Sequence, residues 1–212
     1  VGVSPAAALM LAPQAVSRFH SRWPQVRVRL VDALYPIALA QLRSGELDLA
    51  LGPLPVTGLG RDLEARALID SPEVIAVRAG HPLAKSRHLA DLVGANWVLT
   101  GPARGPGDPA HLQMEKLGLP PPRIMLECDS FSTLLAVLPQ MNAVALMPRR
   151  FFESHGPRIG LAALPIADAL PLTTIHVFLR TDSPLTVPSQ RLLDALVSEA
   201  QALRRTRNSS VG

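Results

Sequence analysis

The sequence predicts an α/β fold of two lobes, and three observations indicate it. Apolar and polar residues alternate in short stretches such as residues 26–32 (VRVRLVD), as they do in half-buried strands. Segments with apolar residues at helical spacing, such as residues 5–22, separate these strands. The alternation then occurs a second time in the later part of the chain. Because strands joined by helices form parallel sheets covered on both faces, each group predicts one Rossmann-like lobe.

The first lobe is expected to be a βαβαβ unit, provided that residues 1–3 end a strand. Ser4 is a suitable N-cap and Pro5 a suitable first residue of the first helix, in which Pro13 should introduce a kink. The expected strands and helices of this unit alternate over residues 1–3, 5–22, 26–32, 36–43 and 47–52.

The rest of the chain continues the pattern after a turn-rich stretch, residues 53–61. Further strands are expected over residues 64–69, 74–78, 96–100, 123–128, 143–147 and 173–179, and helices over residues 110–117, 131–138 and 188–204. The predicted domains are one lobe of residues 1–70 with 171–204, a second lobe of residues 71–170, and a disordered tail of residues 205–212. Ligands of such folds bind beyond the carboxyl ends of the strands, so a cleft between the lobes is the expected site.

Composition excludes several classes of protein. The chain has 212 residues, of which 48% are apolar and 18% charged, so a disordered chain is excluded. Its one cysteine, Cys128, allows no intrachain disulfide and favours a reducing compartment. No apolar run approaches the roughly 20 residues of a membrane helix, and residues 6–12 lack the basic leader of a signal peptide, which disfavours export. The net charge of +4 points only to anionic partners in general.

No catalytic constellation is found in the sequence. Neither a G-x-S-x-G elbow nor a P-loop is present, and the six histidines have no spacing that would make a metal site. His81 lies in a Gly-His-Pro turn, where an exposed side chain is expected. The sequence therefore predicts a protein without enzyme activity, metal or cofactor.

Polar residues at three strand ends predict a small anionic ligand. Ser4 and Ser130 each follow a strand and cap a helix, and helix N-termini attract anions. Thr100 ends another strand and opens the loop of residues 101–107, in which Gly101 and its neighbours offer backbone donors and Arg104 a positive charge. Each feature alone favours an ordinary cap or turn, whereas the three at equivalent strand ends together favour a small anionic ligand.

Several motifs in order resemble the effector-binding domain of LysR-type transcriptional regulators, from Val1 to about Leu203. They are the opening VGVSP; Pro13, Phe19, Pro24 and Val26 at the family's spacing; SGELDLA at residues 44–50; HPLA at 81–84; Asp91-Leu92 with Trp97; and Met147-Pro148. Residues 32–36 (DALYP) and 104–107 (RGPG) are similar to the branch that senses toluenesulfonate and related aromatic acids. The chain departs from other members at residues 141–144, which lack Gly-x-Gly, and at Pro53, where some muconate-sensing members carry arginine.

The resemblance implies a type II periplasmic-binding-protein-like fold and a cytoplasmic, ligand-sensing regulator. Its winged helix-turn-helix is absent from this chain, so DNA binding would belong to the missing N-terminal domain. The expected effector is a small organic acid, an aromatic carboxylate or sulfonate, with its acid group at Ser4 and its apolar body between Tyr35 and Phe131. Family sensors pair through a helix of each lobe, here residues 5–22 and 131–138, which implies a homodimer of the domain and a homotetramer of the full-length protein. An exported solute-binding protein of the same fold, or an enzyme of that architecture, remains an alternative.

Overall fold

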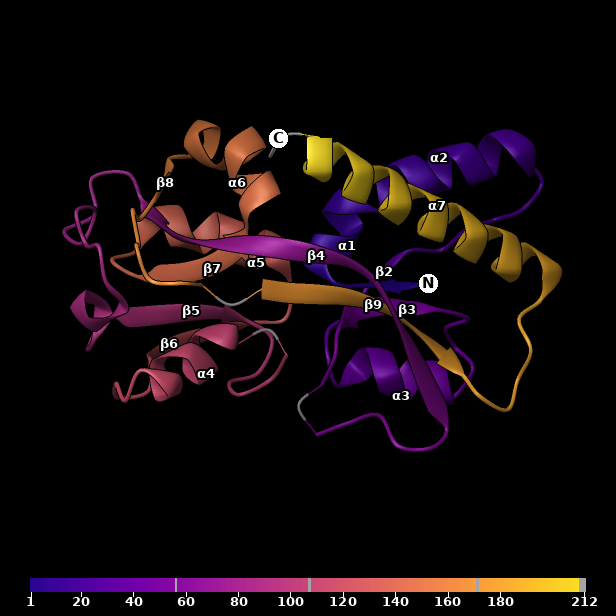
Figure 1. Cartoon of the computed structure of the whole chain (residues 1–212), viewed down its shortest axis with the longest axis horizontal. Coiled ribbons are helices and arrows are strands. Elements are labelled where there is room, and N and C mark those ends of the chain that lie inside the picture. The colour runs from indigo at the N-terminus through magenta and orange to yellow at the C-terminus, as the bar shows by residue number, and fades with distance from the viewer. Residues whose placement is uncertain (56, 107, 171, 210–212) are drawn as a thin grey trace. The chain divides into compact units, whose positions relative to one another are not determined.

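The computed structural model describes residues 1–55, 57–106, 108–170 and 172–209, with side chains as far as residue 205. The chain divides into two compact units (Figure 1). The first unit comprises Val1–Asp70 and Thr174–Gly212, and the second comprises Ser71–Thr173. Each unit contains its own strands and helices and is described by itself.

The sheet of the first unit is mixed. Its strand order is β2-β1-β3-β9-β4, in which β1 is parallel to β2 and β3, whereas β3 is antiparallel to β9. Strands β4 and β9 each continue from one unit into the other. The bounds are β1 (Gly2–Val3), β2 (Val31–Asp32), β3 (Ala50–Pro53), β4 (Leu63–Arg78) and β9 (Leu172–Arg180).

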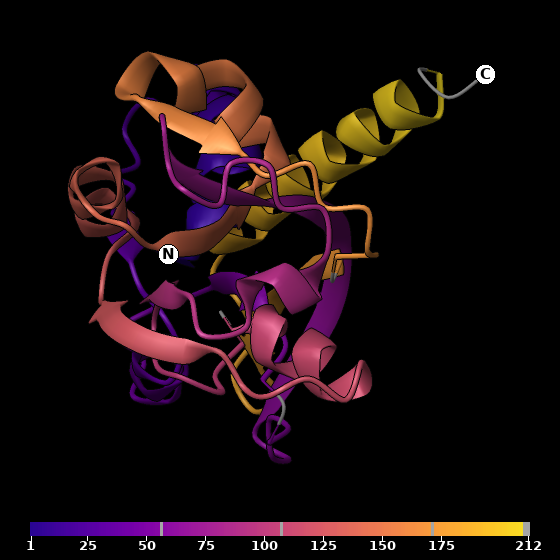
Figure 2. The ribbon, with the colours of Figure 1, turned by 90° about the vertical axis from the view of Figure 1, so that its left-hand side faces the viewer.

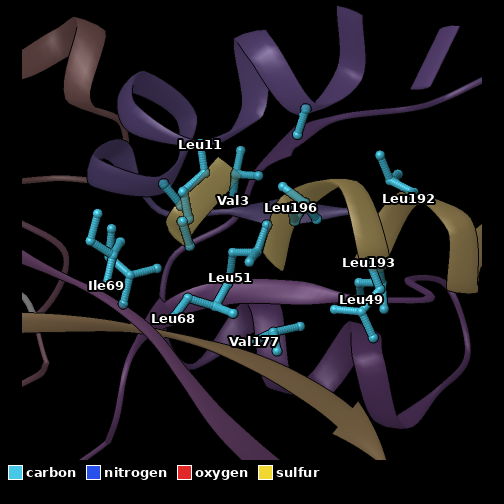
Figure 3. Packing of buried hydrophobic residues seen from close by; sticks show 14 of the residues in the cluster. Val3, Leu11, Leu49, Leu51, Leu68, Ile69, Val177, Leu192, Leu193 and Leu196 are labelled. Carbon is cyan, nitrogen blue, oxygen red and sulfur yellow. The ribbon is translucent and has the colours of Figure 1, made fainter. Parts of the chain in front are cut away.

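Helices cover both faces of this sheet. The four helices are α1 (Pro5–Met10), α2 (Ala12–Arg22), α3 (Ile37–Arg43) and α7 (Val187–Ser209). On one face, leucines of α7 pack against strand residues such as Leu49, Leu51 and Val177 (Figure 3). On the other face, Leu42 of α3 packs with Phe178 of β9. The alternation of side chains along β9 therefore separates two apolar layers.

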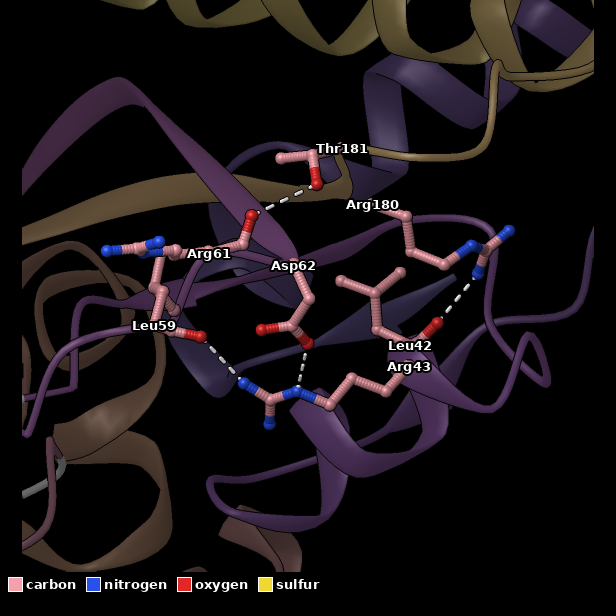
Figure 4. Close-up of polar contacts among 7 residues, drawn as sticks. All are labelled: Leu42, Arg43, Leu59, Arg61, Asp62, Arg180 and Thr181. Carbon is pink, nitrogen blue, oxygen red and sulfur yellow. Dashed lines mark hydrogen bonds and ion pairs between the residues drawn. The ribbon is translucent and has the colours of Figure 1, made fainter.

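The end of α3 is fixed by arginines. Arg43 donates to the carboxylate of Asp62 and, at 2.7 Å, to the carbonyl oxygen of Leu59 (Figure 4). Arg180 of β9 donates to the carbonyl oxygens of Leu42 and Leu47 at 2.7 and 2.9 Å. The last carbonyl groups of a helix lack partners within the helix, so the Arg180 guanidinium supplies one.

The sheet of the second unit is mixed, like that of the first unit, with parallel strands next to antiparallel ones. β5 is parallel to β6 and β7, and β4 is antiparallel to β7 and β8. The fully buried Trp97 of β5 lies in the core on one face, and Cys128 of β6 lies in the core on the other. The new bounds are β5 (Asn96–Thr100), β6 (Arg123–Cys128), β7 (Val144–Pro148), β8 (Leu161–Ala163), α4 (Pro109–Lys116), α5 (Phe131–Val137) and α6 (Arg149–His155). Three short 3₁₀ helices cover Leu89–Leu92, Leu138–Gln140 and Gly156–Ile159.

The predicted α/β class is confirmed, and several elements differ from the sequence prediction. The sheets are mixed rather than parallel, because β4 and β9 run against their neighbours. The strand expected over residues 26–32 is only Val31–Asp32, because its partner β1 offers just Gly2 and Val3 for pairing. The two strands expected over residues 64–69 and 74–78 are one strand; Pro72, which has no N–H, lies directly before the register with β7.

Both terminal helices also differ in detail. The helix expected over residues 5–22 is interrupted at Leu11, two residues before Pro13, and becomes α1 and α2. Helix α7 continues as far as Ser209, over part of the stretch in which the sequence analysis expects a disordered tail from residue 205 (Figure 2). Arg204 and Arg205 are good helix formers and extend the helix beyond the packed leucines. Residues 210–212 of that expected tail lie outside the described residues.

Candidate functional site

Ser4 occupies the junction between β1 and α1. It is 5% exposed, and its Oγ accepts a hydrogen bond from the N–H of Ala7 at 3.4 Å. The Ser4 N–H donates to the carbonyl oxygen of Leu51 at 2.7 Å, which fixes Ser4 beside the end of β3. Because the Oγ accepts the capping bond, its hydrogen is left to donate elsewhere. The predicted cap is confirmed; binding of an acid there stays a prediction.

Tyr35 lies between β2 and α3 in the same unit. Its side chain is half-buried, and the hydroxyl lies 3.2 Å from Oγ1 of Thr57. The half-buried ring packs against the apolar cluster around α3, while the hydroxyl has a protein partner. This placement is compatible with the predicted role of flanking an apolar ligand body.

Thr100 ends β5 as predicted and leads into a tightly bonded loop. The N–H of Gly101 donates to the Cys128 carbonyl oxygen at 2.9 Å, and the N–H of Gly105 donates to the Pro102 carbonyl oxygen at 3.0 Å. Arg104 has a φ of 58°, which is unusual for a residue with a side chain. The half-buried Thr100 hydroxyl has no hydrogen-bond partner among the residues the structure describes.

Two carboxylates occupy the remaining backbone donors of this loop. Glu127 Oε1 accepts from the N–H of Ala103 at 2.9 Å, and Asp108 Oδ2 accepts from the N–H of Arg104 at 3.0 Å. Protein oxygens already accept from the N–H groups of residues 101 and 103–105, and donation from this loop to a ligand stays a prediction. Gly107, at the end of the predicted loop, lies outside the described residues. Thr100 and Arg104 can contribute through their side chains.

Asp108 is a buried carboxylate beside this loop that the sequence reasoning missed. It is 1% exposed and caps α4, with Oδ1 accepting from the N–H of His111 at 3.2 Å. Burial raises the pKa of this carboxyl, and the hydrogen bonds from Arg104 and His111 oppose the shift only in part. The signal was present in the sequence: Asp108 precedes Pro109 as Ser4 precedes Pro5, a cap followed by a first-turn proline.

Ser130 and Phe131 begin α5. Ser130 Oγ accepts from the Thr133 N–H at 3.2 Å and lies 3.0 Å from the hydroxyls of both Ser132 and Thr133. Phe131 is 8% exposed, and its ring packs edge-to-face on Phe151 with centroids 5.1 Å apart. The predicted cap at Ser130 is thus confirmed, whereas Phe131 is largely committed to the core of its unit.

The side chain of His81 is buried, whereas the sequence analysis expects it to be exposed. It is 6% exposed, and its Nδ1 accepts from the N–H of Leu83 at 3.0 Å. Burial and the nearby Arg78 lower its pKa, because both disfavour the charged ring. The neighbouring Gly80 and Pro82 are exposed, so only the His81 ring turns inward, where it holds the turn of the second unit through the bond from Leu83.

Two kinds of feature are absent from the described chain. Within the described residues, no group of three or more histidine, cysteine, aspartate or glutamate side chains is placed to hold a metal ion. In that same part of the chain, no helix combines the length and apolar character needed to cross a membrane.

Comparison with solved structures shows the fold. The effector-binding domain of QuiR in complex with shikimate superposes with a TM-score of 0.77 at 15% identity, covering 95% of each chain. The CcmR regulatory domain of Synechocystis in complex with 2-PG superposes with a TM-score of 0.76 at 21% identity, covering 93% of this chain and 94% of the other. The expected type II periplasmic-binding-protein-like fold is thereby confirmed.

The chain is also similar in sequence to transcriptional regulators. GalR, a helix-turn-helix transcriptional regulator of Pseudomonas putida, is 29% identical over 172 residues, which cover 79% of this chain and 42% of that protein. GbpR of Azospirillum brasilense is 24% identical over 203 residues, covering 92% of this chain and 58% of that protein. The chain thus spans about half the length of these relatives. The LysR substrate binding domain profile matches residues 1–201, so the chain belongs to the LysR substrate-binding domain family.

Proposed function

We propose that this chain is the effector-sensing part of a LysR-type transcriptional regulator. The observation that carries the proposal is the family match over residues 1–201, and the regulators among its relatives favour it over an exported solute-binding protein and over an enzyme. The complete regulator would be cytoplasmic, bind DNA through an N-terminal helix-turn-helix and assemble as a homotetramer from dimers of this domain. Binding would change the balance between conformations of the domain without any bond being made or broken.

The proposed effector is a small organic acid, an aromatic carboxylate or sulfonate. Ser4 would donate its hydroxyl hydrogen to the acid group, and Tyr35 would contact the apolar body. In the second unit the buried Asp108 and the engaged Glu127 disfavour an anion at the loop backbone, so Thr100, Arg104 and Ser130 would contribute side chains instead. Two solved relatives bound to shikimate and to 2-PG support a small-molecule ligand for this fold.

A thermal-shift screen with aromatic carboxylates, aromatic sulfonates and muconates tests the proposal. A ligand at 100 times its dissociation constant stabilises the folded state by about 2.7 kcal/mol, which is a readily measured shift. For any acid that binds, Ser4→Ala should weaken affinity by about ten- to a hundredfold, since a hydrogen bond to a charged group is lost. Unliganded melting of the variant must be measured in parallel, because the helix cap is lost as well. If Ser4→Ala and Thr100→Val both bind with unchanged affinity, the proposed contacts are wrong.

A further inference from the structure

A row of residues crosses the first unit at the carboxyl ends of β1 and β3. Gly52 pairs with His176 of β9, and Ser4 follows the pair Val3 and Leu51 in the register of β1 with β3. A Cβ atom placed on Gly52 would lie 3.5 Å from the Ser4 Cβ, so these two residues point to the same face. Ser4, Gly52 and His176 therefore lie side by side on three neighbouring strands.

His176 belongs to this same face. Ile175 and Val177 enter the apolar layer under α2 and α7, and Phe178 enters the layer under α3. Because side chains alternate along a strand, His176 shares the face of Phe178, and the two rings lie with centroids 6.3 Å apart. Gly52 has no side chain, and a Cβ atom at its position would lie 3.8 Å from the Ser4 Oγ and 3.9 Å from Cε2 of Phe178, so the Phe178 ring borders the space between the Ser4 hydroxyl and the imidazole.

The hydrogen bond of the His176 ring indicates which of its two nitrogens carries the hydrogen. Nδ1 of His176 lies 3.0 Å from the carbonyl oxygen of Thr174, and a carbonyl oxygen can only accept, so Nδ1 carries the hydrogen. In the neutral ring Nε2 is then a bare acceptor. Among the residues the structure describes, no group donates to Nε2, although the side chain is half-buried.

The neighbouring polar side chains on β9 are already engaged. Thr174 Oγ1 donates to Oδ1 of Asp70 at 2.8 Å, and Arg180 donates to two carbonyl oxygens of the α3 region. His176 is thus a side chain of this face of β9 whose ring nitrogen retains an unused acceptor in the described chain. It lies two strand spacings, or roughly 10 Å, from Ser4, with the glycine between them.

We propose that His176 is a specificity-determining residue of the effector site, accepting a hydrogen bond through Nε2 from a hydroxyl group of the ligand. The inference rests on the proposed function and refines it: the preferred effector is a hydroxylated aromatic acid whose acid group lies at Ser4 and whose hydroxyl lies at the far end of the ring. The Ser4 hydroxyl donates to the acid, and Nε2 of His176 accepts from the hydroxyl, so each end of the ligand has one matched partner.

The experiment compares paired probes on the protein and on His176→Phe. Titration calorimetry with 4-hydroxybenzoate against benzoate, and with 4-hydroxybenzenesulfonate against benzenesulfonate, measures the preference for the hydroxyl. A neutral hydrogen bond should make the hydroxylated acid bind about three- to tenfold more tightly. In His176→Phe that ratio should fall to about one, whereas His176→Gln, which keeps an acceptor, should retain part of it.

A matched control is His20→Phe, since His20 is exposed on α2 of the same unit and should leave the ratio unchanged. Unliganded melting of each variant shows whether the fold is intact. If the acids bind and the ratio is the same in the protein and in His176→Phe, the role of His176 is overturned and the sensing function stands. If none of the four acids binds, the aromatic-acid effector is overturned together with the role of His176.

Discussion

The two units stabilise their buried carboxylates in different ways. In the first unit Glu199 of α7 is 5% exposed and lies 3.2 Å from the guanidinium of Arg18. In the second unit the buried Asp108 accepts hydrogen bonds from backbone N–H groups, and the half-buried Glu73 accepts one from the Thr173 hydroxyl at 2.8 Å. Burial raises the pKa of both carboxyls in the second unit, that of Glu73 to about 7.

The two kinds of partner compensate the burial of a carboxylate to different extents. A guanidinium carries a full opposite charge and favours the ionised carboxylate, whereas a single hydroxyl or backbone N–H compensates burial only in part. Three less buried carboxylates have a lowered pKa, because their hydrogen bonds outweigh the cost of burial. The Arg43 side chain lowers the pKa of Asp62, and the N–H groups of Arg87 and Leu89 lower those of Asp91 and Asp168.

The largest expected effect comes from removing the carboxylate of Asp108. Asp108→Ala leaves the N–H groups of Arg104 and His111 without their acceptor and removes the cap of α4. We expect the free energy of unfolding to fall by about 2–4 kcal/mol. Urea unfolding followed by the fluorescence of the tryptophans, of which Trp97 is buried in the same unit, measures it. Asp108→Asn keeps an acceptor oxygen and should lose less; equal midpoints for both variants would mean that the backbone bonds contribute little.

The contribution of Glu73 to the stability of the second unit should depend on pH. A folded-state pKa raised from 4.5 to about 7 means that its protonated form contributes stability below pH 4.5, which is lost as the pH rises through 7. Glu73→Gln should therefore be more stable than the parent at pH 8, by up to about 3 kcal/mol, and similar to it at pH 4. Thermal unfolding at the two pH values tests this. A variant that is less stable at pH 8 would show that the ionised carboxylate is well compensated in the fold.

The smallest expected effect concerns Arg18 in the first unit. Arg18→Ala removes the charged partner of the buried Glu199, but Arg18 is 54% exposed, so water screens part of the interaction. We expect a loss of about 1–3 kcal/mol, below the usual cost of breaking a fully buried pair. Adding Glu199→Gln should restore part of the loss, and a double-mutant cycle from denaturant unfolding measures the coupling. Additive losses would show that the pair contributes no interaction of its own.

The sequence by itself determined the local features that depend on neighbouring residues. The caps at Ser4 and Ser130 and the strands β5 and β6 follow from patterns a few residues long and are found where expected, and the family that the motifs indicate is confirmed, although not its toluenesulfonate-sensing branch. Such patterns act through hydrogen bonds and side-chain periodicity within one element, so they can be recognised before the fold is known.

Tertiary structure decided what depends on partners distant in the chain. The pairing of β9 with β3, which sets His176 opposite Gly52, joins residues more than a hundred positions apart. Glu127 accepts from the N–H of Ala103, 24 positions away in the chain, and so uses a backbone donor that the sequence analysis assigns to a ligand. A strand's own pattern fixes which side chains share a face, but only its register with a neighbour fixes which residues lie beside them. The availability of each donor and acceptor at the candidate site is therefore a property of the folded chain.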